Sequence, residues 1–84
     1  MKTKVWVVII DSADSYEQTT RVELVTSDKK VAEMRLAELR EKIKKYATKR
    51  GYTFDDGKTS VEAYDEGYAA ENHYYAAIHE SNLV

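Results

Sequence analysis

Few side chains in this sequence have the types and spacing that catalysis or metal binding requires. The two histidines, His73 and His79, stand six positions apart. On a strand they would be about 20 Å apart and on a helix about 120° apart, so in neither case could both bind one ion. The chain has no cysteine, which excludes thiolate zinc sites and disulfides. We therefore expect no metal site.

The motifs of nucleophilic and nucleotide-dependent catalysis are also missing. No serine stands in a GxSxG motif, and the three glycines form no phosphate-binding loop. Two pairs of adjacent acids, Asp55–Asp56 and Asp65–Glu66, have the chemistry of an acid and a base, but adjacent carboxylates in loops are usually only solvated. We predict that the protein has no catalytic residues, is not an enzyme and binds no cofactor.

The last third of the chain is acidic and rich in tyrosine. Residues 51–84 contain seven Asp or Glu against one lysine, a net charge of −6. Tyrosine rings are amphipathic and are enriched at protein interfaces. We predict that this segment binds a basic groove on a partner protein. The predicted binding residues are Tyr64, Tyr68, Tyr75, Glu62, Asp65, Glu66 and Glu71.

Residues 28–50 carry the opposite charge, with nine Lys or Arg against four Asp or Glu. They support an alternative function, nucleic-acid binding through phosphate contacts. The residues for this alternative are Lys30, Arg40, Lys44, Lys45 and Lys49. Three glutamates, Glu33, Glu38 and Glu41, interrupt the basic surface, and the isoelectric point is near 5.7. A solvated helix face explains the lysines equally well, so nucleic-acid binding is not the favoured function.

A small sheet and one helix must position these residues. Residues 4–11 predict a strand that is apolar on both faces, and residues 19–26 predict its return strand in a hairpin. For residues 28–50, Ser27 is the predicted N-cap and Gly51 the C-terminal stop of a long helix. Its apolar stripe consists of Ala32, Leu36, Leu39, Ile43, Tyr46 and Ala47. We expect this stripe to pack on Val5, Val7, Ile9, Val22, Leu24 and Ile78.

The C-terminal third is predicted as a loop followed by a hairpin. Residues 51–57 are expected to be a loop whose Tyr52 and Phe54 fold back on the core. Residues 59–65 and 73–81 alternate apolar and polar side chains and predict two strands, with a helix across 68–80 as the alternative. The predicted fold is α+β, ββαββ, an antiparallel sheet with one long helix packed on one face.

Length and hydropathy set the remaining expectations. Eighty-four residues predict a single domain, residues 1–84. The longest apolar run, residues 5–10, is shorter than a membrane span or a signal-peptide core. We therefore expect a cytoplasmic protein that does not bind membranes.

Three parts of the chain resemble a group of short, mostly uncharacterised proteins of bacteria, phages and mobile elements. They are the opening Lys4-Val-Trp-Val-Val, the charged helix, and the segment from Ser60 to His73, Ser-Val-Glu-Ala-Tyr-Asp-Glu-Gly-Tyr-Ala-Ala-Glu-Asn-His, with Ile78 closing the strand. The resemblance implies an accessory protein that inhibits or modulates a host protein, such as a nucleic-acid-handling defence enzyme of the CRISPR type. A self-associating structural protein, a homodimer, stays open as a further alternative.

Overall fold

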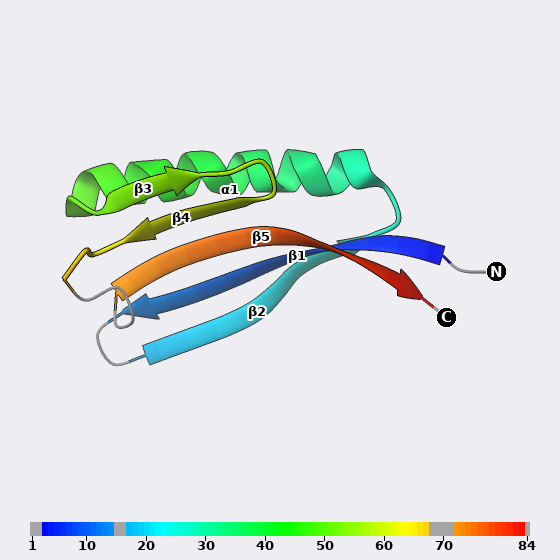
Figure 1. Ribbon diagram of the computed structural model, residues 1–84, viewed down its shortest axis with the longest axis horizontal. Coiled ribbons are helices and arrows are strands. Elements are labelled where there is room, and N and C mark those ends of the chain that lie inside the picture. The colour runs from blue at the N-terminus through cyan, green and yellow to red at the C-terminus, as the bar shows by residue number, and fades with distance from the viewer. Residues whose placement is uncertain (1–2, 15–16, 68–71, 84) are drawn as a thin grey trace.

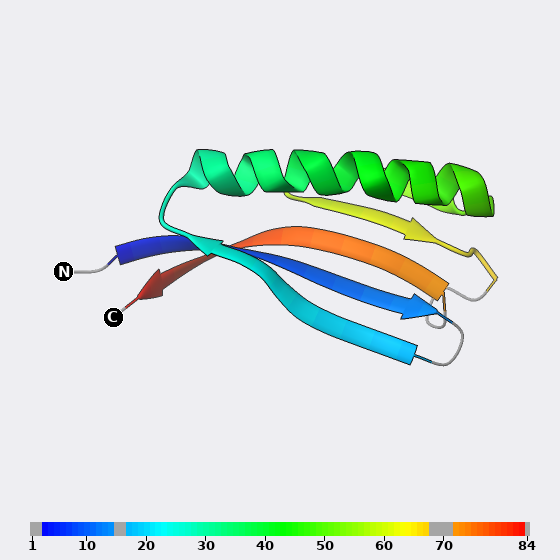
Figure 2. The same ribbon diagram turned by 180° about the vertical axis from the view of Figure 1, so that it is seen from behind.

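The computed structural model describes residues 3–14, 17–67 and 72–83. Five strands form one antiparallel sheet in the order β2-β1-β5-β4-β3, and one long helix runs along one of its faces (Figures 1 and 2). The elements are β1 (Thr3–Asp14), β2 (Glu17–Thr26), α1 (Lys29–Arg50), β3 (Thr53–Asp56), β4 (Ser60–Tyr64) and β5 (Asn72–Leu83). The predicted α+β class, with one helix on an antiparallel sheet, is confirmed.

The structure adds one strand to the predicted order. Residues 53–56 were expected in a loop but form β3, so the order is ββαβββ. Strand β3 pairs with β4, with Phe54 opposite Ala63, and Phe54 packs against the core. Burial of this one ring holds a short and otherwise polar segment in the sheet. The strands predicted at 59–65 and 73–81 are confirmed as β4 and β5, which excludes a helix at 72–80.

Local capping and an apolar stripe define α1. The N-cap is Asp28 and not Ser27, because the Asp28 side chain accepts a hydrogen bond of 2.9 Å from the backbone N–H of Lys30. Gly51 ends the helix with φ of 71°, in the left-handed region that glycine adopts without strain. The predicted stripe is confirmed: its buried members are Ala32, Leu36, Leu39, Ile43 and Ala47, and Tyr46 is half-buried.

The helix packs on the face of β1 opposite to the predicted one. Val8 and Ile10 lie in the core cluster with the helix stripe, whereas Val7, Ile9 and Val22 do not. Of the other predicted contacts, Leu24 and Ile78 pack against this core, and Val5 is buried outside it. Both faces of β1 are apolar, so its alternation did not indicate which face the helix would cover.

An extra residue in β2 sets the partners of β1. Val8 lies opposite Leu24 but Ile9 lies opposite Val22, so Glu23 is an extra residue on β2. Such a bulge changes which side chains of a strand share a face. It places Leu24 on the helix side of the sheet and Val22 on the other side.

Candidate functional site: the open face of the sheet

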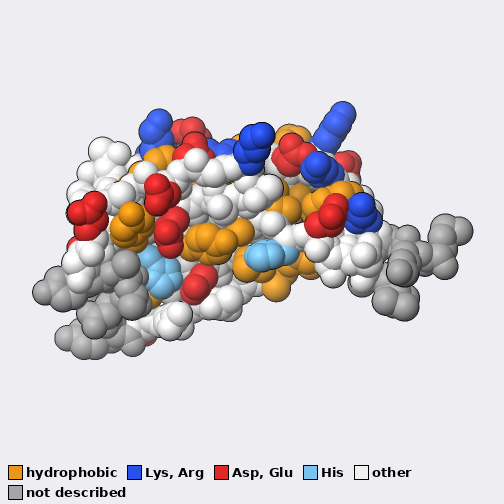
Figure 3. All heavy atoms as spheres, in the orientation of Figure 1, with side chains coloured by type: hydrophobic (Ala, Val, Ile, Leu, Met, Phe, Trp, Pro, Cys, Tyr) orange, Lys and Arg blue, Asp and Glu red, His pale blue; other side chains and the backbone are white. Residues whose placement is uncertain are grey.

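The face of the sheet turned away from α1 has no covering layer among the described residues, and Figure 3 looks onto it. We call it the open face. Side chains directly opposite one another in antiparallel strands lie on the same face, so the pairing register determines which residues it carries. Four adjacent rows, each at a different height along the sheet, cross its strands, and a further pair, Val5 opposite Ser81, lies beyond them.

Two of these rows make up the tyrosine–acid half of the open face. In one row Asp11 of β1 lies opposite Tyr75 of β5, Tyr75 opposite Glu62 of β4, and Glu62 opposite Asp55 of β3. In the next row His73 of β5 lies opposite Tyr64 of β4. These residues are Asp11, Asp55, Glu62, Tyr64, His73 and Tyr75, and together they form a half-exposed surface of rings and carboxylates.

Tyr64 shows the electrostatic character of this half. The nearby Asp55 carboxylate raises the pKa of Tyr64 above its ordinary value of 10.0, followed by desolvation and by Glu66 and Glu62. A negative environment disfavours ionisation of a phenol, so Tyr64 stays a neutral hydrogen-bond donor among acids.

Asp11 is held by two neighbours at the other end of its row. It accepts a hydrogen bond of 3.1 Å from the Thr20 hydroxyl, and its second oxygen lies 3.6 Å from Nε2 of His73. Both contacts keep the Asp11 side chain on the open face next to Tyr75. These contacts therefore fix the position of the Asp11 carboxylate on the open face.

The other two rows form the aliphatic half. Val7 lies opposite Val25 and His79, and Ile9 lies opposite Val22 and Ala77. Val22 is 60% exposed and Val25 is 56% exposed, although both are large and apolar. In Figure 3 hydrophobic patches lie across the middle of this face, acidic side chains lie toward its left end, and Lys and Arg follow the upper rim above α1. An apolar area bordered by charge is characteristic of interaction surfaces.

The structure places the predicted binding residues in two groups and adds two acids and one histidine that the sequence did not indicate for binding. Glu62, Tyr64 and Tyr75 share the open face. Asp65 and Glu66 follow β4 in a turn, where Glu66 accepts a hydrogen bond of 2.9 Å from the Thr53 hydroxyl. Tyr68 and Glu71 lie outside the described residues.

The added acids are Asp11 and Asp55, and the added histidine is His73. Asp11 comes from β1, at the opposite end of the chain, and Asp55 comes from the strand that was expected to be a loop. The Asp55–Asp56 pair is split, because Asp56 points to the helix side and forms an ion pair with Arg40. The only local indication that Asp55 lies on the open face is the change from apolar Phe54 to charged Asp55, because consecutive side chains of a strand point to opposite faces.

The residues of the nucleic-acid alternative are spread over the opposite side. Lys44, Lys45 and Lys49 line one shallow depression of α1 together with Glu41 and Thr48. Arg40 forms an ion pair with Asp56 and donates a hydrogen bond of 2.9 Å to the carbonyl of Gly57. Lys30 lies at the other end of the helix. Of the five residues of this alternative, Lys44, Lys45 and Lys49 therefore lie together on α1, and Lys30 and Arg40 lie apart from them.

The described residues offer little for other chemistry. Among residues 3–14, 17–67 and 72–83, no three His, Cys, Asp or Glu side chains are grouped to hold a metal ion. Helix α1, the one helix in these ranges, is not apolar enough to cross a membrane.

No protein-family model matches the chain, and no curated protein or solved structure is significantly similar to it.

Proposed function

We propose that the protein is a non-catalytic binding module that docks its open face on a basic surface of another protein. The observation that carries this proposal is the row Asp11–Tyr75–Glu62–Asp55, which runs across four strands beside exposed Val22 and Val25. Amphipathic rings and aliphatic side chains supply the desolvated centre of an interface. The carboxylates supply charge complementarity to lysines and arginines of the partner.

The charge separation between the two faces orients the docking. Asp11, Asp55 and Glu62 lie on the open face, whereas α1 on the opposite side carries nine Lys or Arg against three Glu. A basic partner attracts the first face and repels the second, so electrostatic steering selects one orientation. A partner groove that normally receives nucleic acid has the required positive charge.

The resemblance of residues 60–73 to short proteins of phages and mobile elements supports a host target. We propose that the protein acts in the cytoplasm by occluding such a groove on a nucleic-acid-handling defence enzyme, for example a CRISPR-type effector. Inhibition would then be steric and electrostatic and would require no chemistry from this chain.

Site-specific photo-crosslinking in a bacterial host lysate tests this proposal. A benzophenone amino acid replaces Tyr75 on the open face in one sample and Lys45 on α1 in the other. We expect a discrete heavier adduct from position 75 alone, and its loss when Glu62→Lys is added. The matched substitution Glu41→Lys on α1 should leave the adduct unchanged.

Three results would contradict the proposal. Crosslinking from position 45 alone would place the binding surface on the helix and favour nucleic-acid-type contacts. A crosslink only to a second copy of the chain would favour self-association. An adduct that persists unchanged with Glu62→Lys would remove the role of the acids.

A further inference from the structure

A short part of β5 has one hydrogen-bonding edge without a partner strand. Strand β4 begins at Ser60, opposite Ala77, whereas β5 continues to Leu83. Residues 79–83 of β5 pair with β1 on one side, from Val7 to Thr3. On the other side the described residues place no strand beside them, and residues 79–82 are exposed.

One backbone hydrogen bond establishes which backbone groups point to this vacant side. The N–H of Ile78 donates to the carbonyl of Thr59 at 2.9 Å. In an antiparallel sheet the direction of these groups alternates with a period of two. The N–H and C=O of Glu80 and Asn82 therefore point away from β1, into the position that β4 would occupy if it were longer.

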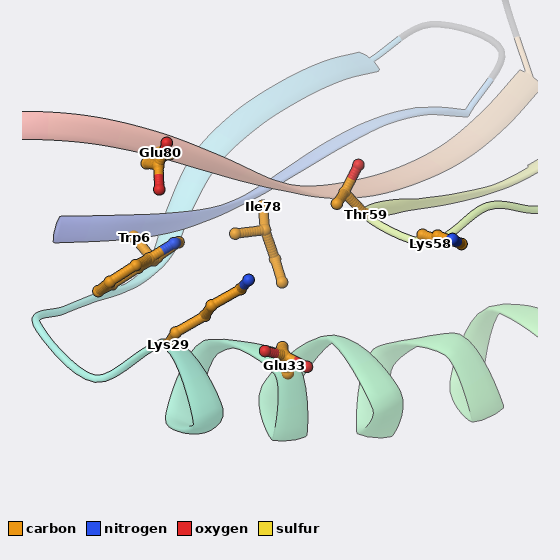
Figure 4. Close-up of a pocket in the computed structure, with 7 residues that line it drawn as sticks. All are labelled: Trp6, Lys29, Glu33, Lys58, Thr59, Ile78 and Glu80. Atoms are coloured by element: carbon orange, nitrogen blue, oxygen red, sulfur yellow. The ribbon is translucent and has the colours of Figure 1, made fainter. Parts of the chain in front are cut away.

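A pocket of about 400 Å³ adjoins the same edge. Its floor is formed by Trp6 and Ile78, which are half-buried on the helix side of the sheet. Lys29 and Glu33 face them from the first turns of α1, and Figure 4 shows Lys29 extending toward Ile78. The remaining lining residues are Lys58, Thr59 and Glu80.

The charges of this pocket cancel. Two lysines and two glutamates stand around an aromatic and aliphatic floor, so the site has no net preference for an anion or a cation. Its size is within the range of ordinary ligand pockets. A neutral, apolar side chain therefore fits this pocket best.

The geometry points to a binding site for an extended peptide of a partner protein, added to the sheet beside residues 79–83 of β5. The peptide would continue the line of β4, which is recognition by strand addition. A residue directly opposite Glu80 would exchange two hydrogen bonds with its outward N–H and C=O. Because Glu80 and Trp6 are opposite each other on the helix side, the same peptide residue would direct its side chain into the pocket.

This site is separate from the open face and does not depend on it. The two lie on opposite sides of the sheet, since the pocket is between the sheet and α1. A partner could therefore be held both by its basic surface on the open face and by a flanking extended segment here. Either site can fail its test without affecting the other.

A defined peptide series is the probe for this site. Each peptide has nine residues, acetylated and amidated ends, and alternating threonine and valine around a central phenylalanine, leucine, serine or aspartate. Binding is followed by amide NMR and by hydrogen exchange. We expect the phenylalanine peptide to bind at least tenfold more tightly than the serine and aspartate peptides. The Glu80 and Asn82 amides should gain protection, while those of His79 and Ser81, which point to β1, should not change.

Matched variants separate strand addition from binding elsewhere. Glu80→Pro removes the outward N–H at a position where proline is tolerated on an edge, and Glu80→Ala removes the same side chain but keeps the N–H. We expect at least tenfold weaker binding for Glu80→Pro than for Glu80→Ala. Glu33→Trp should block the pocket, whereas Glu41→Trp, elsewhere on α1, should have no effect.

The proposal would be overturned by any of three results. One is the absence of binding by the phenylalanine peptide at 1 mM. Another is equal affinity of Glu80→Pro and Glu80→Ala with protected amides elsewhere. The third is a concentration-dependent dimer that Glu80→Pro dissociates, which would make a second copy the occupant in place of a partner peptide.

Discussion

Tyr64 of β4 and Asp55 of β3 are diagonal neighbours on the open face, since Tyr64 lies opposite Thr53 and Asp55 lies opposite Glu62. Asp55 raises the pKa of Tyr64 because it stabilises the neutral phenol and repels the phenolate. Asp56, the next residue, points to the other side and binds Arg40. The two adjacent acids therefore form a natural pair for comparison.

We expect Asp55→Asn to lower the pKa of Tyr64 toward its ordinary value, since the substitution removes the nearby negative charge. NMR titration of protein carrying ¹³C-labelled tyrosine rings measures this directly, with Tyr64→Phe to assign the signal. Asp56→Asn is the control and should leave the Tyr64 titration in place. Equal shifts in the two variants would show that Asp55 is not the main cause.

Stability should decrease at alkaline pH. The pKa of Tyr64 is raised mainly by Asp55, and that of Tyr52 is raised mainly by burial, followed by Tyr46. A folded pKa above the unfolded one means that the folded state retains the proton longer. The stabilisation is therefore complete below about pH 10 and is lost as the pH rises through the folded pKa values.

Urea unfolding between pH 9 and 11.5 measures this loss. We expect the unfolding free energy to fall across that range and to fall less steeply in Tyr52→Phe, which cannot ionise. A rising or flat profile in the parent protein would contradict the direction of both pKa shifts.

Leu39 tests the assigned helix stripe. Its side chain is 4% exposed in the core between α1 and the sheet, so Leu39→Ala should cost about 2–5 kcal/mol of unfolding free energy. Met34, on the same helix, is 65% exposed, and Met34→Ala should change stability by less than about 0.5 kcal/mol. Chemical denaturation compares the two, and similar losses would mean that the stripe is wrongly assigned.

Arg40 connects α1 to the turn between β3 and β4. It forms an ion pair with Asp56 and donates to the Gly57 carbonyl at 2.9 Å. We expect Arg40→Ala to destabilise the protein by about 1–2 kcal/mol, and Lys45→Ala on the exposed helix surface to have almost no effect. Thermal unfolding of both variants checks this, and hydrogen exchange should show the loss of protection concentrated in β3.

Nucleic-acid binding should be weak. The cations grouped on α1 are Lys44, Lys45 and Lys49, beside Glu41, and three phosphate contacts give a shallow salt dependence and low affinity. In gel-shift assays at physiological salt we expect no retardation of DNA or RNA. Tight binding that disappears when the three lysines become glutamates would reverse this expectation and favour the helix as the functional surface.

Local sequence patterns predict the helix and most of the strands of this protein. The stripe from Ala32 to Ala47, spaced for a helix and followed by Gly51, specifies α1 without help from the rest of the chain. The alternation in residues 59–65 and 73–81 predicted strands for the same reason, with a helix across 68–80 as the alternative that the structure excludes for residues 72–80. These patterns depend on neighbours within a few positions, and the periodicity of helices and strands is a property of such short segments.

Which faces of these elements meet depends on contacts between segments that are far apart in the sequence. Strand β1 is apolar on both sides, so its own pattern did not indicate which face α1 covers, and the bulge in β2 placed Leu24 instead of Val22 on the covered side. Strand β3 is short and mostly polar. It forms because it pairs with β4 and because Phe54 packs against the core. The pairing register of four strands places Asp11 and Asp55 in one row with Glu62 and Tyr75. Pairing between distant segments depends on packing energy over the whole sheet, and no local pattern of residues encodes it.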